Sequence, residues 1–233
     1  MSLPRTPAAE AMDASDLDPR RHEQALAGLV RLNRWSGVAR LLWPEVARAA
    51  RAAHGTIELL DVAAGAGDVP VALARRARAA GLPLRVTALD RSATALEHAA
   101  RRARAAGVEL HTLQADALAP GGLPCRADVV TCSLFLHHLD PDAAPRLLRA
   151  AADAARRRLL VCDLRRSRAG LALAATASHL ASRSPVVHAD APASVRNAWT
   201  PTEALELAAR AGLQGARVRH VFPQRWLLSW SPP

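Results

Sequence analysis

The residues of this chain that could bind a cofactor gather around one short loop. Ala63, Gly65 and Gly67 alternate in a run of small residues that leads from an apolar stretch into a helix-forming one, and Asp61 precedes them. A chain that turns sharply and lets a ligand touch its backbone needs residues without bulky Cβ substituents. Asp90 ends the next apolar stretch, at about the spacing at which a carboxylate grips ribose hydroxyls. The pattern predicts a nucleotide-cofactor loop, although small-residue loops also occur as plain turns.

The composition limits the classes of partner. The chain has 233 residues, 50% of them hydrophobic, which is enough for one domain with a substantial core. Its formal net charge of +10 could indicate nucleic-acid binding. Every one of the 31 basic residues is Arg, however, and they are spread over most of the expected helices rather than clustered. Aromatic residues, at 3% of the chain, leave few platforms on which bases could stack. We therefore expect no nucleic-acid partner.

The cysteines and the N-terminal segment bear on the compartment. Cys125, Cys132 and Cys162 are odd in number and lack the CxxC spacing, so neither a disulfide framework nor a metal cluster is expected. Residues 1–21 lack the apolar core of a signal peptide and are predicted to be a mobile tail. The apolar stretch 169–181 is shorter than the roughly 20 residues that cross a bilayer. These features favour a cytoplasmic protein without stable membrane insertion.

Strand-like and helix-like segments alternate through the middle of the chain. Two helices are expected within residues 22–55. Strands are expected at residues 56–62, 84–89, 108–113, 128–133 and 158–162. Helices are expected between them at residues 68–80, 92–106 and 143–156, the second with Ser92 as its N-cap. Such alternation predicts an α/β fold in which helices cover both faces of a parallel sheet.

The rhythm changes after Asp163. Residues 164–199 combine an Arg-rich turn, an apolar segment and a Pro-punctuated stretch. Thr200 and Glu203 then have the spacing of a capping box, so a helix is expected from there to Gly212. Two further strands are expected at residues 216–221 and 225–229, close enough to form a hairpin.

Three acids follow this pattern of strands. Asp61, Asp90 and Asp116 each stand at the carboxyl end of an expected strand. Taken singly, each is also typical of a helix cap or an exposed turn. The carboxyl ends of parallel strands share one edge of the sheet, which is where ligands bind in such folds. We therefore expect the three acids to converge on one crevice.

The order and spacing of these motifs resemble those of class I S-adenosylmethionine-dependent methyltransferases. Residues 61–67 resemble the first motif of that family, with Ala63 where a glycine usually stands, and residues 128–133 resemble its fourth. The resemblance implies a Rossmann-like sheet of seven strands, mostly parallel with the last strand antiparallel. It also implies one domain over residues 22–233, with a helical cap at 22–55 and a lid insertion at 164–199. It implies S-adenosylmethionine as cofactor, bound by Asp61, Ala63, Gly65, Gly67, Asp90, Arg91, Asp116, Ala117 and Ser133.

Two histidines follow the fourth expected strand, where this family places residues that face the transferred methyl group. A phenol has an ordinary pKa of about 10, so its methylation at neutral pH is helped by a base that titrates near 7. Histidine is the side chain that does so unaided. His137, and after it His138, are therefore candidate catalytic bases. The alternative is that both are structural.

Arginines are the candidates for binding the methyl acceptor. Arg165 and Arg166 leave the fifth expected strand at the same edge of the sheet, where a fixed positive charge could stabilise a phenolate or enolate. A solvated basic turn is the other interpretation. Arg34 lies in the leading helices that would close the opposite side of the site.

A finer resemblance concerns the acceptor. Residues 33–35, 133–139, 163–168 and 200–203 are similar to segments of ubiquinone- and menaquinone-type methyltransferases and of bacterial enzymes that modify polyketide phenols. We therefore expect a monomeric or homodimeric enzyme that methylates a small, apolar, aromatic acceptor, with oxygen favoured over carbon. The contrasting hypothesis is a module that binds the cofactor or nucleic acid without transferring a methyl group.

Overall fold

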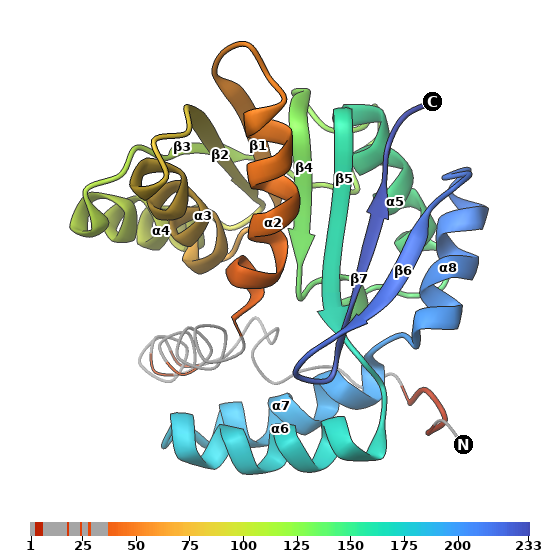
Figure 1. Ribbon diagram of the computed structural model, residues 1–233. Coiled ribbons are helices and arrows are strands. Elements are labelled where there is room, and N and C mark those ends of the chain that lie inside the picture. The colour runs from red at the N-terminus through yellow and green to blue at the C-terminus, as the bar shows by residue number, and fades with distance from the viewer. Residues whose placement is uncertain (1–2, 7–17, 19–23, 25–27, 29–36) are drawn as a thin grey trace.

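A computed structural model describes residues 3–6, 18, 24, 28 and 37–233. Its centre is a seven-stranded sheet in the order β3-β2-β1-β4-β5-β7-β6 (Figure 1). The strands are β1 (Ile57–Val62), β2 (Leu84–Asp90), β3 (His111–Gln114), β4 (Ala127–Ser133), β5 (Ala155–Leu164), β6 (Arg217–Val221) and β7 (Arg225–Trp230). The first five strands run parallel, and β7 is antiparallel to both of its neighbours. The expected Rossmann-like sheet with an antiparallel last strand is confirmed.

Helices cover both faces of this sheet (Figure 1). They are α2 (Val38–Arg51), α3 (Asp68–Ala79), α4 (Ala93–Ala106), the 3₁₀ turn η2 (Leu136–His138), α5 (Ala143–Ala154), α6 (Arg168–Ala181), α7 (Pro185–Asn197) and α8 (Pro201–Arg210). Along β1, Leu59 joins the core beneath α2 and α3, and Leu60 joins the core beneath α5 and α8. Successive strand residues point to opposite faces, so a strand covered on both sides is apolar throughout.

The predicted N-terminal caps of α4 and α8 are confirmed. The Ser92 hydroxyl accepts a hydrogen bond from the Ala95 amide at 3.2 Å and caps α4. Thr200 and Glu203 form the reciprocal capping box of α8, with each side chain bonded to the other residue's backbone amide. A cap satisfies amide groups that the first helical turn leaves without partners.

Several segments differ from the sequence-based expectation. The third strand begins later than residue 108, since β3 covers His111–Gln114, and the helix expected at residues 143–156 ends at Ala154. The fifth strand is longer than residues 158–162, because pairing with β4 and β7 extends it over Ala155–Leu164. The Pro-punctuated stretch forms α7, in which Pro185 occupies the first turn and Pro192 lies inside the helix. Proline is tolerated in a first turn, where its missing N–H has no helical partner, but it weakens a helix interior. Packing of α7 against α6 and η2 accompanies the exception at Pro192.

The α6 and α7 helices lie across the end of the sheet at which β4 and β5 terminate (Figure 1). The rings of His179 and His188 stack between these two helices with centroids 4.0 Å apart. This pair of helices therefore sits over the edge on which the candidate residues were expected to converge. No helix in the described part of the chain is both long and apolar enough to cross a membrane.

Candidate active site

The loop after β1 has the backbone of a glycine-rich turn. Ala63, Gly65 and Gly67 have φ angles of 54°, 53° and 74°. Glycine reaches this left-handed region without a Cβ penalty, whereas other L-residues adopt it at a cost of about 1–2 kcal/mol. Ala63, which stands where the motif usually has its first glycine, therefore keeps a glycine-type conformation despite its methyl group.

The two glycines of the loop do different work. A Cβ placed on Gly67 would lie 2.5 Å from the Cβ of Ala99, so its absence lets α3 pack closely against α4. A Cβ placed on Gly65 would meet no described atom within 4 Å. Gly67 is thus required by packing, and Gly65 leaves its backbone open at the carboxyl edge of the sheet.

Asp90 ties this open loop to the end of β2. One carboxylate oxygen accepts the Gly65 amide at 2.8 Å, and the other accepts the Ser92 amide at 2.9 Å. A carboxylate oxygen has lone pairs for more than one hydrogen bond, so both oxygens can still accept from a ligand hydroxyl. Asp90 is therefore in direct contact with the loop.

Asp61 lies beneath the loop rather than on its surface. Its side chain is buried, and one oxygen accepts a hydrogen bond from the Thr131 hydroxyl at 2.5 Å. Burial, with help from the negative charges of Asp68 and Asp90, raises the pKa of Asp61 to about 7, against the opposing effect of the Thr131 hydrogen bond. Asp61 is thus a buried acid poised near neutrality at the centre of the sheet.

The remaining cofactor candidates lie after β2 and β3. Arg91 is exposed, and its carbonyl accepts the Gln114 side-chain amide at 3.2 Å. Asp116 is exposed and accepts the Leu118 amide at 2.9 Å, while Ala117 is buried. The Ala115 amide donates to the Asp90 carbonyl at 3.1 Å, so this segment sits directly beside the end of β2.

His137 and Asp163 form a buried pair at the ends of β4 and β5. His137 Nδ1 lies 2.7 Å from one carboxylate oxygen, and the His137 amide donates to the other at 3.0 Å. Burial alone would raise the pKa of Asp163, but His137 and the amide of Leu164 outweigh it and hold that pKa below its usual value. An ionised carboxylate only accepts, so Nδ1 carries the proton and Nε2 is the basic atom.

His138 and Ser133 flank this pair differently. His138 is exposed, and its ring lies against that of His137 with centroids 4.3 Å apart. The Ser133 hydroxyl, at the end of β4, is buried and has no hydrogen-bond partner within the described residues. The next residue, Leu134, has a left-handed φ of 54°. Strained backbone and an unpaired buried hydroxyl at one strand end are typical of a binding site.

Comparison with known families matches residues 59–158 to the model described as a methyltransferase domain. This matched segment covers less than half of the chain. It contains β1, β2, β3 and β4 from Leu59 onward, and with them the glycine-type loop, Asp90 and His137. Comparison with curated proteins found no match.

Solved structures extend the likeness beyond this segment. The S-adenosylmethionine-dependent methyltransferase SibL is 26% identical, with a TM-score of 0.63 over 87% of this chain and 56% of SibL. An O-methyltransferase family 2 protein from Planctomyces limnophilus, solved with apigenin, is 22% identical, with a TM-score of 0.62 over 93% of this chain and 63% of that protein. Magnesium protoporphyrin IX methyltransferase from Synechocystis, solved with SAH, is 15% identical, with a TM-score of 0.57 over 95% and 91%. The chain thus spans just over half the length of SibL.

Magnesium protoporphyrin IX methyltransferase from Synechocystis is also solved with SAM bound. Residues at the carboxyl edge fit such a group. Gly65 leaves room above its backbone, Asp90 has acceptor capacity beside it, and the buried Ser133 hydroxyl lacks a partner within the described residues. In the same part of the chain, no cluster of three His, Cys, Asp or Glu side chains could hold a metal ion.

The arginines expected to bind the acceptor differ in burial and in their partners. Arg165 is partly buried, and its amide donates to the Gln224 carbonyl at 2.9 Å. Arg166 is buried, and its guanidinium donates to the carbonyls of Leu3 and Ala198 and to the Glu203 carboxylate. These partners give Arg166 a role in joining the β5–α6 turn to the start of α8. Arg34 lies outside the described residues.

Residues 3–6 belong to the predicted tail of residues 1–21, and they contact the same region. The Arg5 guanidinium lies 3.6 Å from the centre of a Trp199 ring and donates to the Asn197 carbonyl at 2.7 Å. The Leu3 carbonyl accepts from Arg166 at 2.7 Å. This short segment therefore packs against the junction of α7 and α8.

Two residues of the site have little signal in the sequence. Asp163 follows the fifth expected strand, 158–162, with no role predicted for it, whereas in the structure its carboxylate orients His137. Arg225 begins β7 and is buried beside the end of β5. An acid directly after the apolar run 158–162 was the one available signal for Asp163, because a charged residue in a buried strand requires a partner.

Proposed function

We propose that this protein transfers the methyl group of S-adenosylmethionine to a hydroxyl oxygen of a small aromatic acceptor. The observation that carries the proposal is the His137–Asp163 pair, joined at 2.7 Å at the ends of β4 and β5. A base next to the methyl donor is what oxygen methylation of a phenol at neutral pH requires, because the neutral hydroxyl is a weak nucleophile.

Residues after β1, β2 and β3 would hold the donor. Asp90 would accept hydrogen bonds from the ribose hydroxyls, Gly65 would let the backbone approach, and Asp116 with Ala117 would flank the adenine. Bound there, S-adenosylmethionine supplies a methyl group on a positively charged sulfur, which makes that carbon electrophilic. Asp90 already lies against the Gly65 amide, so this half of the site is formed in advance of binding.

His137 would act as the general base. Asp163 holds the proton on Nδ1, so Nε2 is the ring nitrogen that would take the proton of the acceptor hydroxyl as the oxygen attacks the methyl carbon and the carbon–sulfur bond breaks. The resulting imidazolium is stabilised by the same carboxylate. Positioned bases of this kind contribute roughly 100-fold or more to rate. The His138 ring, tilted by 33° against that of His137 at a centroid distance of 4.3 Å, would limit the movement of the His137 ring.

The helical pair α6–α7 would serve as the lid within residues 164–199. It lies over the carboxyl edge of the sheet, and Arg165 precedes it in the turn after β5 (Figure 1). Covering the edge would exclude water, which strengthens the electrostatic interactions inside and suits an apolar substrate. The phenolic or quinol-type acceptor of the proposal agrees with the apigenin bound to the Planctomyces limnophilus protein.

Transfer of labelled methyl groups tests the proposal. The protein is incubated with S-adenosylmethionine carrying a labelled methyl group and a panel of phenols, quinols and RNA, and the product is analysed by mass spectrometry and NMR. We expect a methoxy product from an aromatic member of the panel. Label on a ring carbon would refute the choice of oxygen, and label on RNA alone would refute the choice of a small acceptor. Cofactor binding without label in any acceptor would favour a binding module instead.

A further inference from the structure

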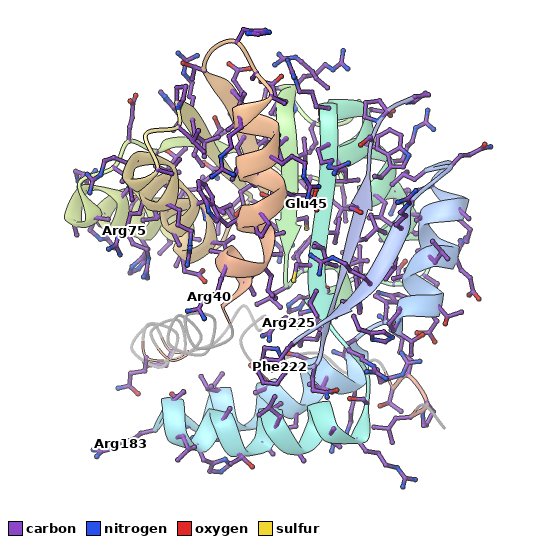
Figure 2. The ribbon with its side chains drawn as sticks, in the orientation of Figure 1. Arg40, Glu45, Arg75, Arg183, Phe222 and Arg225 are labelled. Carbon is purple, nitrogen blue, oxygen red and sulfur yellow. The ribbon has the colours of Figure 1, made fainter. Side chains whose placement is uncertain are left out.

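Arg225 is a buried cation at the same edge as the catalytic pair. It is the first residue of β7 and lies opposite Leu164, the last residue of β5, in the antiparallel register. Only 8% of its surface is exposed. Figure 2 places Arg225 at the lower end of the sheet, between Arg40 at the start of α2 and Phe222 at the β6–β7 turn. The residue therefore belongs to the end of the sheet that faces α6 and α7.

The guanidinium of Arg225 has few partners. One terminal nitrogen donates to the Pro223 carbonyl at 3.1 Å, and Nε is buried without a hydrogen-bond partner in the described part of the chain. The same residues provide no carboxylate within ion-pair distance of it. A guanidinium has five N–H donors, so most of its hydrogen-bonding capacity is unused by these residues.

The groups nearest to Arg225 do not neutralise it. Asp163 is the acid whose charge acts on Arg225, but its oxygens are engaged by His137 and by the Leu164 amide. Burial raises the pKa of the Cys162 thiol to about 12, so that group is neutral. Burial also lowers the pKa of Arg225, although an arginine remains protonated at neutral pH. Burying a charged guanidinium without an anion beside it costs folding free energy, and a ligand that supplies the anion would offset this cost.

The register of the sheet places Arg225 relative to the catalytic pair. Asp163 lies opposite Trp226, and Leu164 lies opposite Arg225. Neighbouring strand residues point to opposite faces. Asp163 therefore shares the α5–α8 face with Trp226, and Arg225 shares the α2–α3 face with Leu227, both at the end of the sheet where β5 stops. An acceptor that spans this end of the sheet would present one substituent to His137 and another to Arg225.

We infer that Arg225 binds a carboxylate of the methyl acceptor, so that the substrate is a hydroxylated aromatic acid rather than a neutral phenol. The inference rests on the proposed function and specifies its substrate class. The planar fork of arginine matches a carboxylate through two parallel hydrogen bonds. The hydroxyl is then held toward His137 Nε2, and Arg225 is a substrate-binding residue that takes no part in proton transfer.

Matched acceptors test this assignment. The kcat/KM value is measured for a hydroxylated aromatic acid and for its neutral methyl ester, in the wild type, Arg225→Met, Arg225→Lys and the control Arg219→Met. Arg219 is an exposed arginine on the neighbouring strand β6. The wild type should favour the acid by about 10-fold or more, as expected for a charge-assisted pair. Arg225→Met should abolish that preference mainly through KM, Arg225→Lys should retain part of it, and Arg219→Met should leave it unchanged.

Three outcomes would overturn the assignment. In the first, the wild type prefers the ester to the acid; in the second, Arg225→Met keeps the preference for the acid. In the third, Arg225→Met loses activity on both acceptors equally although its melting temperature equals that of the wild type. If Arg225→Met does not fold, the wild-type preference and its partial loss in Arg225→Lys decide the matter. Methylation of neutral phenols with no role for Arg225 would refute this inference alone, whereas methylation of no aromatic hydroxyl would refute the proposed function itself.

Discussion

Two regions of the carboxyl edge are built in different ways. The β1–β2 region, consisting of Asp61, the loop 63–67 and Asp90, is made by left-handed backbone and by two carboxylates, of which Asp90 accepts two backbone amides and Asp61 accepts the Thr131 hydroxyl. The β4–β5–β7 region, consisting of Ser133, His137, Asp163 and Arg225, contains one side-chain pair, His137 with Asp163, and two buried polar groups, Ser133 Oγ and Arg225 Nε, without a partner in the described residues. The first region has the geometry of a cradle for a cofactor common to many enzymes, and the second has the chemistry that would select a substrate.

This difference yields distinct expectations for variants. Changes in the β1–β2 region should alter cofactor affinity or stability while the acceptor chemistry survives. Changes in the β4–β5–β7 region should alter turnover or acceptor choice while cofactor affinity survives. Measuring both quantities for each variant separates the two regions.

The largest effect is expected at Asp163. Asp163→Asn removes the ionised acceptor that holds the proton on His137 Nδ1, so Nε2 is no longer reliably the basic atom. We expect kcat to fall roughly 100-fold or more, with cofactor affinity by calorimetry unchanged. Asp153→Asn, at an exposed acid on α5 paired with Arg149, is the matched control. Wild-type turnover in Asp163→Asn would remove Asp163 from the mechanism.

A pH-dependent effect is expected at Asp61. Its pKa of about 7 in the folded protein lies above the ordinary 3.8, so the folded state binds the proton more tightly than the unfolded state. The resulting stabilisation is complete below about pH 4 and is lost as pH rises to about 7. Asp61→Asn has no such titration, so its unfolding free energy relative to wild type should rise by on the order of 3 kcal/mol from pH 5 to pH 8. Urea unfolding at both pH values measures this, and a constant difference would contradict it.

A smaller effect is expected at Asp90. Asp90→Ala removes the carboxylate proposed to bind the ribose, so cofactor affinity should fall about 10- to 100-fold, as for loss of hydrogen bonds to a charged group. Isothermal titration with S-adenosylmethionine measures the change. Asp128→Ala is a control in which the lost carboxylate also accepts a backbone amide, that of Glu58, at the opposite end of the sheet. Equal affinity in wild type and Asp90→Ala would refute the assignment.

The smallest substitutions separate the two glycines of the loop. Gly67→Ala should lower the unfolding free energy by about 2–5 kcal/mol, because the new Cβ overlaps Ala99 and the residue also keeps a left-handed φ. Gly65→Ala meets no such contact and should cost about 1–2 kcal/mol from its φ alone, while it also weakens cofactor binding. Thermal melting with and without S-adenosylmethionine distinguishes them. Equal loss of stability in the two variants would argue against the packing role of Gly67.

The same contrast explains which parts of the molecule were predictable from sequence. The loop, the Ser92 cap and the capping box at Thr200 depend on residues only a few positions apart, so the local sequence was sufficient to predict them. The sheet followed from strands that alternate with helices, because short connections favour parallel neighbours.

The β4–β5–β7 region could be predicted only in part. The position of His137 after a strand indicated a candidate base, but its partner lies 26 residues away and is brought close only by the pairing of β4 with β5. Arg225 adjoins Leu164 because a distant hairpin adds to the sheet, and no local pattern marks that neighbour. The helix at Pro185–Asn197 was missed because packing on α6 and η2 outweighs the weak helical preference of a Pro-punctuated sequence.

The most direct measurement is the single-turnover rate of labelled methyl transfer to the hydroxyl of an aromatic acceptor by wild type and His137→Gln. His220→Gln, on the exposed strand β6, controls for substitution of a histidine elsewhere. We predict a fall of roughly 100-fold or more in His137→Gln, with unchanged binding of S-adenosylmethionine. Transfer by His137→Gln at the wild-type rate would contradict the assignment of His137 as the base.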